Sequence, residues 1–352
     1  MRVLKYMLLV VSIGIAILIS GISGCLMAPY SVGEPDSLLS EYVLVWDLID
    51  SHYACFFAKD NVDWDESYHK FKSAAEDAHN RSQLLDICIE LMSEFEDQNL
   101  ILRDAQTVLE SWNQGDFLNW DLNVLMSYIQ DWILPDSIEY LFYYDAMVIS
   151  TALPADTVGY VYISNLGSGF DVLSFYSVTY AIAECSSIIL DLRMCNESGF
   201  EVNALYAIGR FSENAVLSYY KSIRTGPGRN DMGEMQEVFT NRNGAWQFTD
   251  PIVLLTGRDT QGAAEQLVLL LKTQQHVTVI GDTTAGFANP AVSFNLTADW
   301  TIKIPEMVTY SLDNTLILNS GIAPDIYIPV SEADFAAGID PVLDAAIEMI
   351  VD

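Results

Sequence analysis

From residue 158 onwards the sequence alternates between short, mostly apolar strands and helices, and this alternation restricts the fold more than any other feature. Residues 187–192 and 252–256 have the length and apolar content of buried strands. Further strands are expected at 158–164, 215–223, 277–280 and 322–328, with a hairpin formed by 292–296 and 300–304. Helices are expected at 171–184, 201–211 and 263–272, and a last helix starts with Asp340 as its cap. A chain that alternates in this way folds as an α/β domain, and we predict such a core over residues 158–352.

The region before this core has helical periodicity. Apolar side chains recur every three or four residues between residues 36 and 96, and Ser82 is a suitable N-cap for the third of three expected helices. We therefore predict a small helical cap over residues 26–103. Residues 104–157 contain three tryptophans but no clear period, and we interpret them as a connecting segment.

The first 25 residues have the features of a targeting segment. Arg2 and Lys5 precede an apolar stretch that ends in Ile22-Ser23-Gly24-Cys25. This ending resembles a bacterial lipoprotein signal, which implies cleavage before Cys25, lipid attachment at that cysteine and export to the cell envelope. An ordinary secretory signal or an uncleaved anchor is the alternative. Leu26 is not the aspartate that retains some lipoproteins at the inner membrane, which favours the outer membrane.

The composition excludes several partner classes. The formal net charge is −32, which repels nucleic acid and anionic lipid and leaves a lipid on Cys25 as the means of membrane attachment. The sequence has no CxxC pair and no histidine cluster, so it does not support a metal or any other cofactor. Cys55 and Cys88 either form a disulfide or remain buried thiols.

Several short motifs occur in a consistent order along the chain, at 45–53, 62–65, 95–102, 159–164, 188–193, 221–231, 281–286 and 321–325. Together they resemble the C-terminal processing peptidases, also called tail-specific proteases, including the tricorn-core branch. The resemblance implies a crotonase-like spiral of ββα units behind a helical cap. It also implies acyl transfer by a serine, with a base to remove the hydroxyl proton and backbone N–H groups to hold the oxyanion.

The positions that carry this chemistry in the family are substituted here. The family's nucleophile turn, Thr-x-Ser-Ala-Ala-Glu, reads Thr-Gln-Gly-Ala-Ala-Glu, which places Gly262 at the serine. Asn99 stands at the base histidine and Leu318 at the supporting glutamate, while Phe287 occupies the lysine position of the other branch. Because glycine has no side chain and asparagine takes no proton at neutral pH, the resemblance implies an enzyme scaffold without its reactive groups.

Two main interpretations follow from these substitutions. The first is a non-catalytic relative whose cleft binds a peptide, a protein C-terminus or a small apolar ligand. The second is an active serine-type peptidase with a rearranged site, for which Thr260 is the candidate substitute nucleophile. A third interpretation is a lipid-tethered subunit that only presents a surface. The aromatic side chains of 104–157 would suit a ligand site, although core packing is the favoured explanation for them.

Overall fold

The computed structural model describes residues 30–31, 36–104, 108–110, 148–152, 158–167, 169–196, 199–297 and 299–351. The expected leader with Cys25, and most of the expected connecting segment, lie outside the described residues. Within the described ranges, no helix combines the length and the apolar character that crossing a membrane requires.

A six-stranded sheet forms the centre of the molecule, in the order β14-β10-β9-β6-β5-β4. Its strands are β4 (Val148–Ala152), β5 (Val158–Ile163), β6 (Ser187–Asp191), β9 (Ile252–Thr256), β10 (Val277–Gly281) and β14 (Ile326–Tyr327). All neighbours are parallel except β4, which pairs antiparallel with β5. The two central strands, β6 and β9, are buried along their whole length because helices cover both faces.

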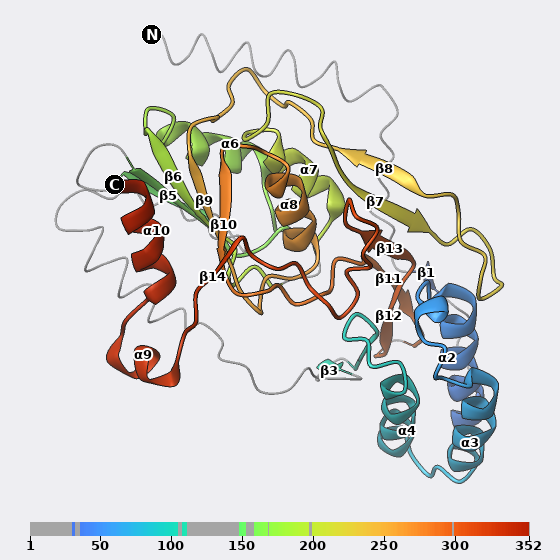
Figure 1. The fold of residues 1–352 in the computed structure, drawn as a ribbon. Helices are drawn as coiled ribbons and strands as arrows, with labels where there is room; N and C mark the ends of the chain where they lie inside the picture. Colours follow the sequence, from blue (N-terminus) through green and yellow to red (C-terminus); the bar gives the residue numbers. More distant parts are fainter. Residues whose placement is uncertain are drawn as a thin grey trace, which may run out of the picture.

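Alternate residues of each strand point to opposite faces, and each face has its own apolar core. Val161, Leu190 and Leu254 belong to the core shared with α6 (Val172–Ala181), α7 (Glu201–Ile208) and α8 (Ala263–Lys272). Tyr160, Ile189 and Val253 point the other way, onto α10 (Pro341–Val351). Figure 1 shows α6, α7 and α8 on one side of this sheet and α10 on the other. Along the chain, α9 (Glu332–Ala337) follows β14 and leads into α10.

Two smaller sheets extend the core. One has the order β13-β7-β8, with β7 (Leu217–Ile223), β8 (Gln236–Phe239) and β13 (Met307–Tyr310). The other has the order β1-β11-β12-β2-β3. Its strands are β1 (Tyr30–Ser31), β2 (Ile101–Arg103), β3 (Val108–Glu110), β11 (Ala291–Asn295) and β12 (Thr301–Pro305). Because β2 pairs with β12, the N-terminal region and the α/β core share one sheet.

The N-terminal region contains α2 (Leu38–His52), the short 3-10 turn Phe56–Ala58, α3 (Trp64–Glu76) and α4 (Arg81–Ser93). Side-chain oxygens of Ser37, Asp63 and Asn80 cap the three α-helices. Asn80, and not the expected Ser82, caps α4 because the helix begins two residues earlier. The aromatic side chains of these helices pack in a core that continues onto the β11–β12 hairpin. The rings of Trp46 and Trp64, for example, stack with centroids 5.7 Å apart.

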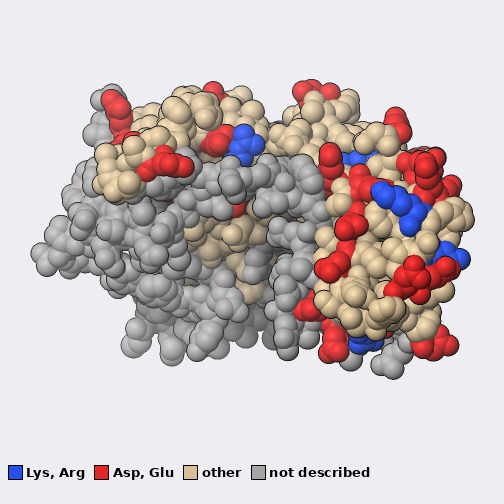
Figure 2. Space-filling view, turned by 90° about the horizontal axis from the view of Figure 1, so that it is seen from below, with Lys and Arg blue, Asp and Glu red and all other residues tan. Residues whose placement is uncertain are grey.

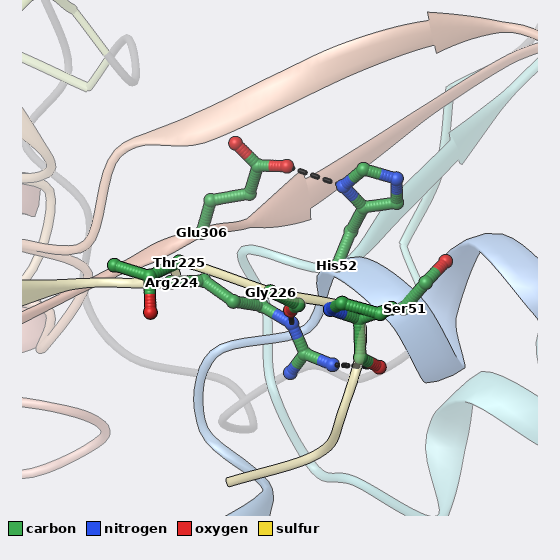
Figure 3. A pocket seen from close by; sticks show the side chains of 7 residues that line it. Ser51, His52, Arg224, Thr225, Gly226 and Glu306 are labelled. Atoms are coloured by element: carbon green, nitrogen blue, oxygen red, sulfur yellow. Dashed lines mark hydrogen bonds and ion pairs between the residues drawn. The ribbon is translucent and has the colours of Figure 1, made fainter. Parts of the chain in front are cut away.

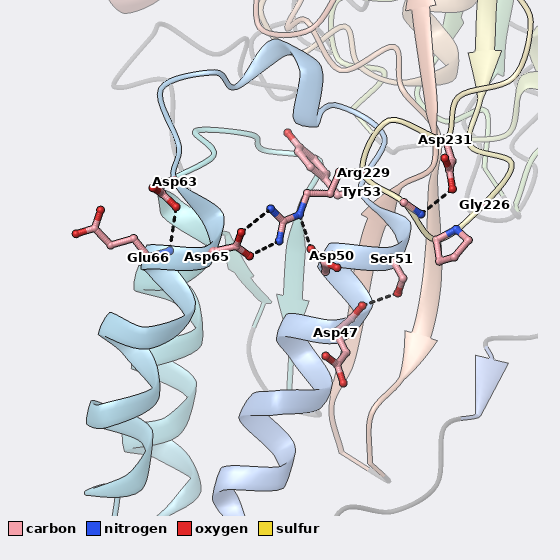
Figure 4. Close-up of polar contacts among 12 residues, drawn as sticks. Asp47, Asp50, Ser51, Tyr53, Asp63, Asp65, Glu66, Gly226, Arg229 and Asp231 are labelled. Atoms are coloured by element: carbon pink, nitrogen blue, oxygen red, sulfur yellow. Dashed lines mark hydrogen bonds and ion pairs between the residues drawn. The ribbon is translucent and has the colours of Figure 1, made fainter.

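A loop after β7 ties these helices to the core. Arg229 forms ion pairs with Asp50 and Asp65, each at 2.6 Å, and so joins α2 to α3 (Figure 4). Arg224 donates to the carbonyl oxygen of Asp50 at 2.7 Å and to that of Tyr53 at the end of α2. Acidic side chains are spread over the surface of these helices, as the view from below shows (Figure 2).

The predicted α/β core behind a small helical region is confirmed. The strand 252–256 and the helix 263–272 have their predicted bounds. The expected strand 322–328 is reduced to the two residues of β14, which lies at the edge of the sheet and is exposed. β8 and β13 are not among the strands predicted from the sequence. β8 is mostly exposed and β13 is only four residues long, so neither has a clear apolar period.

Candidate functional site

Loops from the carboxyl ends of β6, β9 and β10 meet at one edge of the central sheet, because parallel strands end on the same side. Gln261 N donates to Cys195 O at 3.0 Å, which joins the loop after β9 to the loop after β6. Ala285 N donates to Thr260 O at 3.1 Å, which joins it to the loop after β10. This is the place where an α/β sheet ordinarily holds its ligands.

Gly262 lies at the centre of this edge, as the N-cap of α8. It is buried, with φ of 60° and ψ of −121°. An L-residue in this conformation is strained, by roughly 1–3 kcal/mol, and such strain is characteristic of the strand–turn–helix elbow that presents a nucleophile. The backbone at Gly262 therefore keeps the geometry of a nucleophile turn while the residue offers no attacking atom.

The carboxylate of Glu265 organises the surrounding backbone. It accepts hydrogen bonds from the N–H groups of Gly262 (3.2 Å), Gly286 (2.7 Å) and Phe287 (2.5 Å). The hydroxyl of Thr284 donates to it at 2.5 Å. Burial raises the pKa of Glu265 to about 7, against the opposing effect of these four donors. Both of its oxygens are occupied, so Glu265 supports the turn and is not available as a base.

Thr260, the candidate substitute nucleophile, is fully buried. Its hydroxyl donates to Leu192 O at 2.9 Å and accepts from Gly257 N at 3.0 Å. The hydroxyl therefore closes the turn between β9 and α8 and joins it to the end of β6. A hydroxyl held in this way has no proton acceptor to activate it and does not face an open site.

Hydrogen bonds link the remaining predicted positions. Phe287 is buried. The backbone N–H groups of Phe287 and Gly262 both donate to the carboxylate of Glu265. Asn319, next to Leu318, donates from its N–H to Gly286 O at 2.9 Å and from Nδ2 to Glu96 O at 2.6 Å. The segments that carry positions 262, 287, 318 and 99 thus form one continuous network, which we call the former site.

The side chains at these positions have no acid–base function. Leu318 is buried in the apolar core of the N-terminal helices. Asn99 is buried. Its backbone N–H donates to the buried carboxylate of Asp97, which also accepts from the Tyr53 hydroxyl at 2.8 Å. Burial raises the pKa of Asp97 above its ordinary value.

Asp259 is a titratable residue of this edge that the sequence analysis missed. It lies in the turn between β9 and Gly262, and burial raises its pKa to about 6. An aspartate in a polar turn gives no sequence signal of burial, because burial depends on the loops that pack over the turn.

Among the described residues, no group of three His, Cys, Asp or Glu side chains is arranged to hold a metal ion.

A buried ion-pair network braces the same edge. Arg193, which is 1% exposed, bonds Asp191 at 2.6 Å and Asp340 at 2.9 Å. The Tyr160 hydroxyl donates to Asp191 at 2.8 Å. Asp340 also caps α10 by accepting from Leu343 N, as the sequence predicts. The network therefore connects the end of β6 to the start of α10.

A cavity of about 340 Å³ lies between the end of α2, the loop after β7 and the junction of β12 and β13 (Figure 3). Its lining includes His52, Arg224 and Glu306. His52 Nδ1 pairs with the Glu306 carboxylate, and Arg224 donates to backbone carbonyls of α2 and of its own loop. These polar groups are therefore committed to holding the N-terminal helices on the core.

The four cysteines of the described residues, Cys55, Cys88, Cys185 and Cys195, are buried free thiols.

Comparisons with known proteins give consistent results. Residues 157–328 match the model of peptidase family S41. A putative peptidase from Parabacteroides merdae superposes with a TM-score of 0.74 at 23% identity, covering 90% of this chain and 98% of that one. A lipoprotein from Streptococcus agalactiae gives 0.59 at 12% identity, covering 87% and 97%. The photosystem II D1 C-terminal processing protease gives 0.52 at 11% identity, covering 84% and 94%. None of the curated proteins matches the sequence.

Proposed function

Since residues 157–328 belong to peptidase family S41, we propose that this chain is a non-catalytic member whose former site binds a ligand without hydrolysing it. The observation that carries the proposal is Gly262, which holds the φ of 60° of a nucleophile turn without a nucleophile. Serine hydrolysis needs an attacking oxygen and a proton acceptor beside it. Among the described residues, the former site supplies neither.

The ligand that suits such a site best is a peptide or a protein C-terminus, since the processing peptidases that this chain resembles act on such substrates. A small apolar ligand is the alternative that the family resemblance leaves open. The active-peptidase interpretation requires Thr260 to react. The two hydrogen bonds that hold its hydroxyl argue against that role.

We expect Gly262→Ser to show no peptide hydrolysis above background and no labelling by a fluorophosphonate probe, because a serine alone lacks a base. Gly262→Ala is the matched control, since it imposes the same backbone strain without a hydroxyl. The measurements are turnover of fluorogenic peptides and gel detection of the probe on wild type and both variants. Turnover by Gly262→Ser but not by Gly262→Ala would show that a base is present. Labelling of wild type that Thr260→Ala abolishes would establish the active-peptidase alternative.

We also propose that the chain is exported and held on a membrane, leaning to the outer membrane, by lipid on Cys25. The motif Ile22-Ser-Gly-Cys25 supports this proposal. In bacteria grown with alkyne-palmitate, the wild type should incorporate the label and Cys25→Ser should not. Cys185→Ser, which alters a buried thiol elsewhere, should label normally. Incorporation by Cys25→Ser would refute lipidation at that residue.

A further inference from the structure

Strand β8 has one open edge. Among the described strands, β7 is its only neighbour, and Figure 1 shows β8 outermost in this small sheet, with β7 between it and β13. Directly after the strand, Thr240 N donates to Val216 O at 2.8 Å, so this N–H points to the side of β7. Because these groups alternate along a strand, the N–H and C=O groups of Glu237 and Phe239 point the other way, to the open edge.

The side chains along this edge are accessible to a partner. Phe239 is 41% exposed, and Met235, directly before the strand, is 49% exposed. Glu237, which lies between them in the sequence, is exposed as well. Val238 points the other way and belongs to the apolar core of the sheet. The open edge therefore presents a carboxylate with an apolar side chain two residues away in each direction.

The carboxylate of Glu237 has no cationic partner in the part of the chain that the structure describes. Tyr220 lies opposite it on β7. Lys221, the next residue of that strand, pairs with Glu201 instead. The charge that would complement this edge must therefore come from another molecule.

A second copy of the chain fits this edge poorly. Antiparallel pairing of two β8 strands about their centres would bring the Glu237 side chains of both copies near each other, and like charges across strands are destabilising. The net charge of −32 on each copy adds to the repulsion. The same charges attract an extended segment that carries basic side chains, so a basic partner is favoured over self-association.

We propose that the open edge of β8 binds an extended, basic segment of a partner protein by adding it to the sheet as a strand. The main chain of the segment bonds Glu237 and Phe239, whatever its sequence. Selection comes from one face, where a Lys or Arg lies opposite Glu237 and apolar side chains two residues away contact Met235 and Phe239. This edge contains no residue of the former site and does not rest on the proposed function.

Fluorescence anisotropy with the purified full chain and the labelled peptide Thr-Leu-Thr-Lys-Thr-Leu-Thr tests the proposal. Its Leu, Lys and Leu side chains share one face of a strand, and both termini are blocked so that it carries no C-terminal carboxylate. The control peptide has Glu in place of Lys. At low salt the Lys peptide should bind at least about fivefold more tightly, because an opposite charge replaces a like charge across the strands. Equal binding of the two peptides would overturn the proposal.

The matched variants are Glu237→Lys and Glu234→Lys, since both residues are exposed and both changes alter the net charge equally. Glu234 lies before the strand, so its loss should change the preference for the Lys peptide by less than about twofold. Glu237→Lys should remove the preference. Equal effects of the two variants would show that the peptide responds to net charge alone and would refute the site.

Methylation of peptide nitrogens tests the main-chain bonds. In an antiparallel addition the N–H groups of Leu, Lys and Leu face β8, so methylating them should weaken binding at least about tenfold, and methylating the inner two threonines by less than about threefold. Equal losses would exclude strand addition. Sedimentation of the chain at the same concentration should show a monomer. A dimer that the peptide dissociates would assign the edge to a second copy and overturn the proposal.

Discussion

Replacing Arg193 by methionine is expected to lower the free energy of unfolding by about 3–5 kcal/mol. The guanidinium is 1% exposed and holds Asp191 and Asp340, both completely buried. Methionine fills much of the same volume but leaves two carboxylates without a counter-charge in a region that excludes water. The loss should separate the end of β6 from the start of α10, and urea unfolding followed by circular dichroism measures it.

Arg258→Met is the control for this experiment. Arg258 is 40% exposed and its pair with Asp282 spans 3.3 Å at the surface, so its loss should cost less than about 1 kcal/mol. The effect of Arg193→Met should also decrease at low pH, because protonation neutralises the stranded carboxylates. A loss below about 1 kcal/mol for Arg193→Met would contradict the bracing role of the network.

Replacing Glu265 by alanine is expected to cost about 3–5 kcal/mol, because four donors lose their acceptor in a fully buried position. Gly262, Thr284, Gly286 and Phe287 all depend on this one carboxylate, so the turns at the former site should loosen together. Glu265→Gln should cost less, since the amide keeps one acceptor oxygen. Glu237→Gln, on the exposed strand β8, is the control and should be nearly neutral.

The pH dependence of stability gives a second test of Glu265. Burial raises its pKa from the ordinary 4.5 to about 7, so between these values the folded chain binds a proton that the unfolded chain releases. This contribution to stability is fully present below pH 4.5 and is lost as the pH rises to about 7, by about 3 kcal/mol. Urea unfolding at pH 5 and pH 8 should show a smaller decline for Glu265→Gln than for wild type. Equal declines would show that Glu265 does not titrate in this range.

Local sequence predicts the elements that carry the former site. Ile252–Thr256 is an uninterrupted run ending in a polar turn, and Ala263–Lys272 follows with a helical period, so both have their predicted bounds. Buried elements of this kind leave a strong apolar pattern. The edge strand β8 leaves none, because most of its side chains are exposed, and the apolar run at 322–328 predicts a longer strand than the two exposed residues of β14. Sequence alone therefore locates the centre of the sheet better than its margins.

The sequence by itself determined that position 262 carries no hydroxyl and position 99 no titratable nitrogen, whatever the fold. Only the tertiary structure decided that the Thr260 hydroxyl is bound on both sides and that Glu265 holds four donors. Residue identity fixes the functional groups. Their charge state and availability depend on burial and on partners far away in the chain, which only folding brings together.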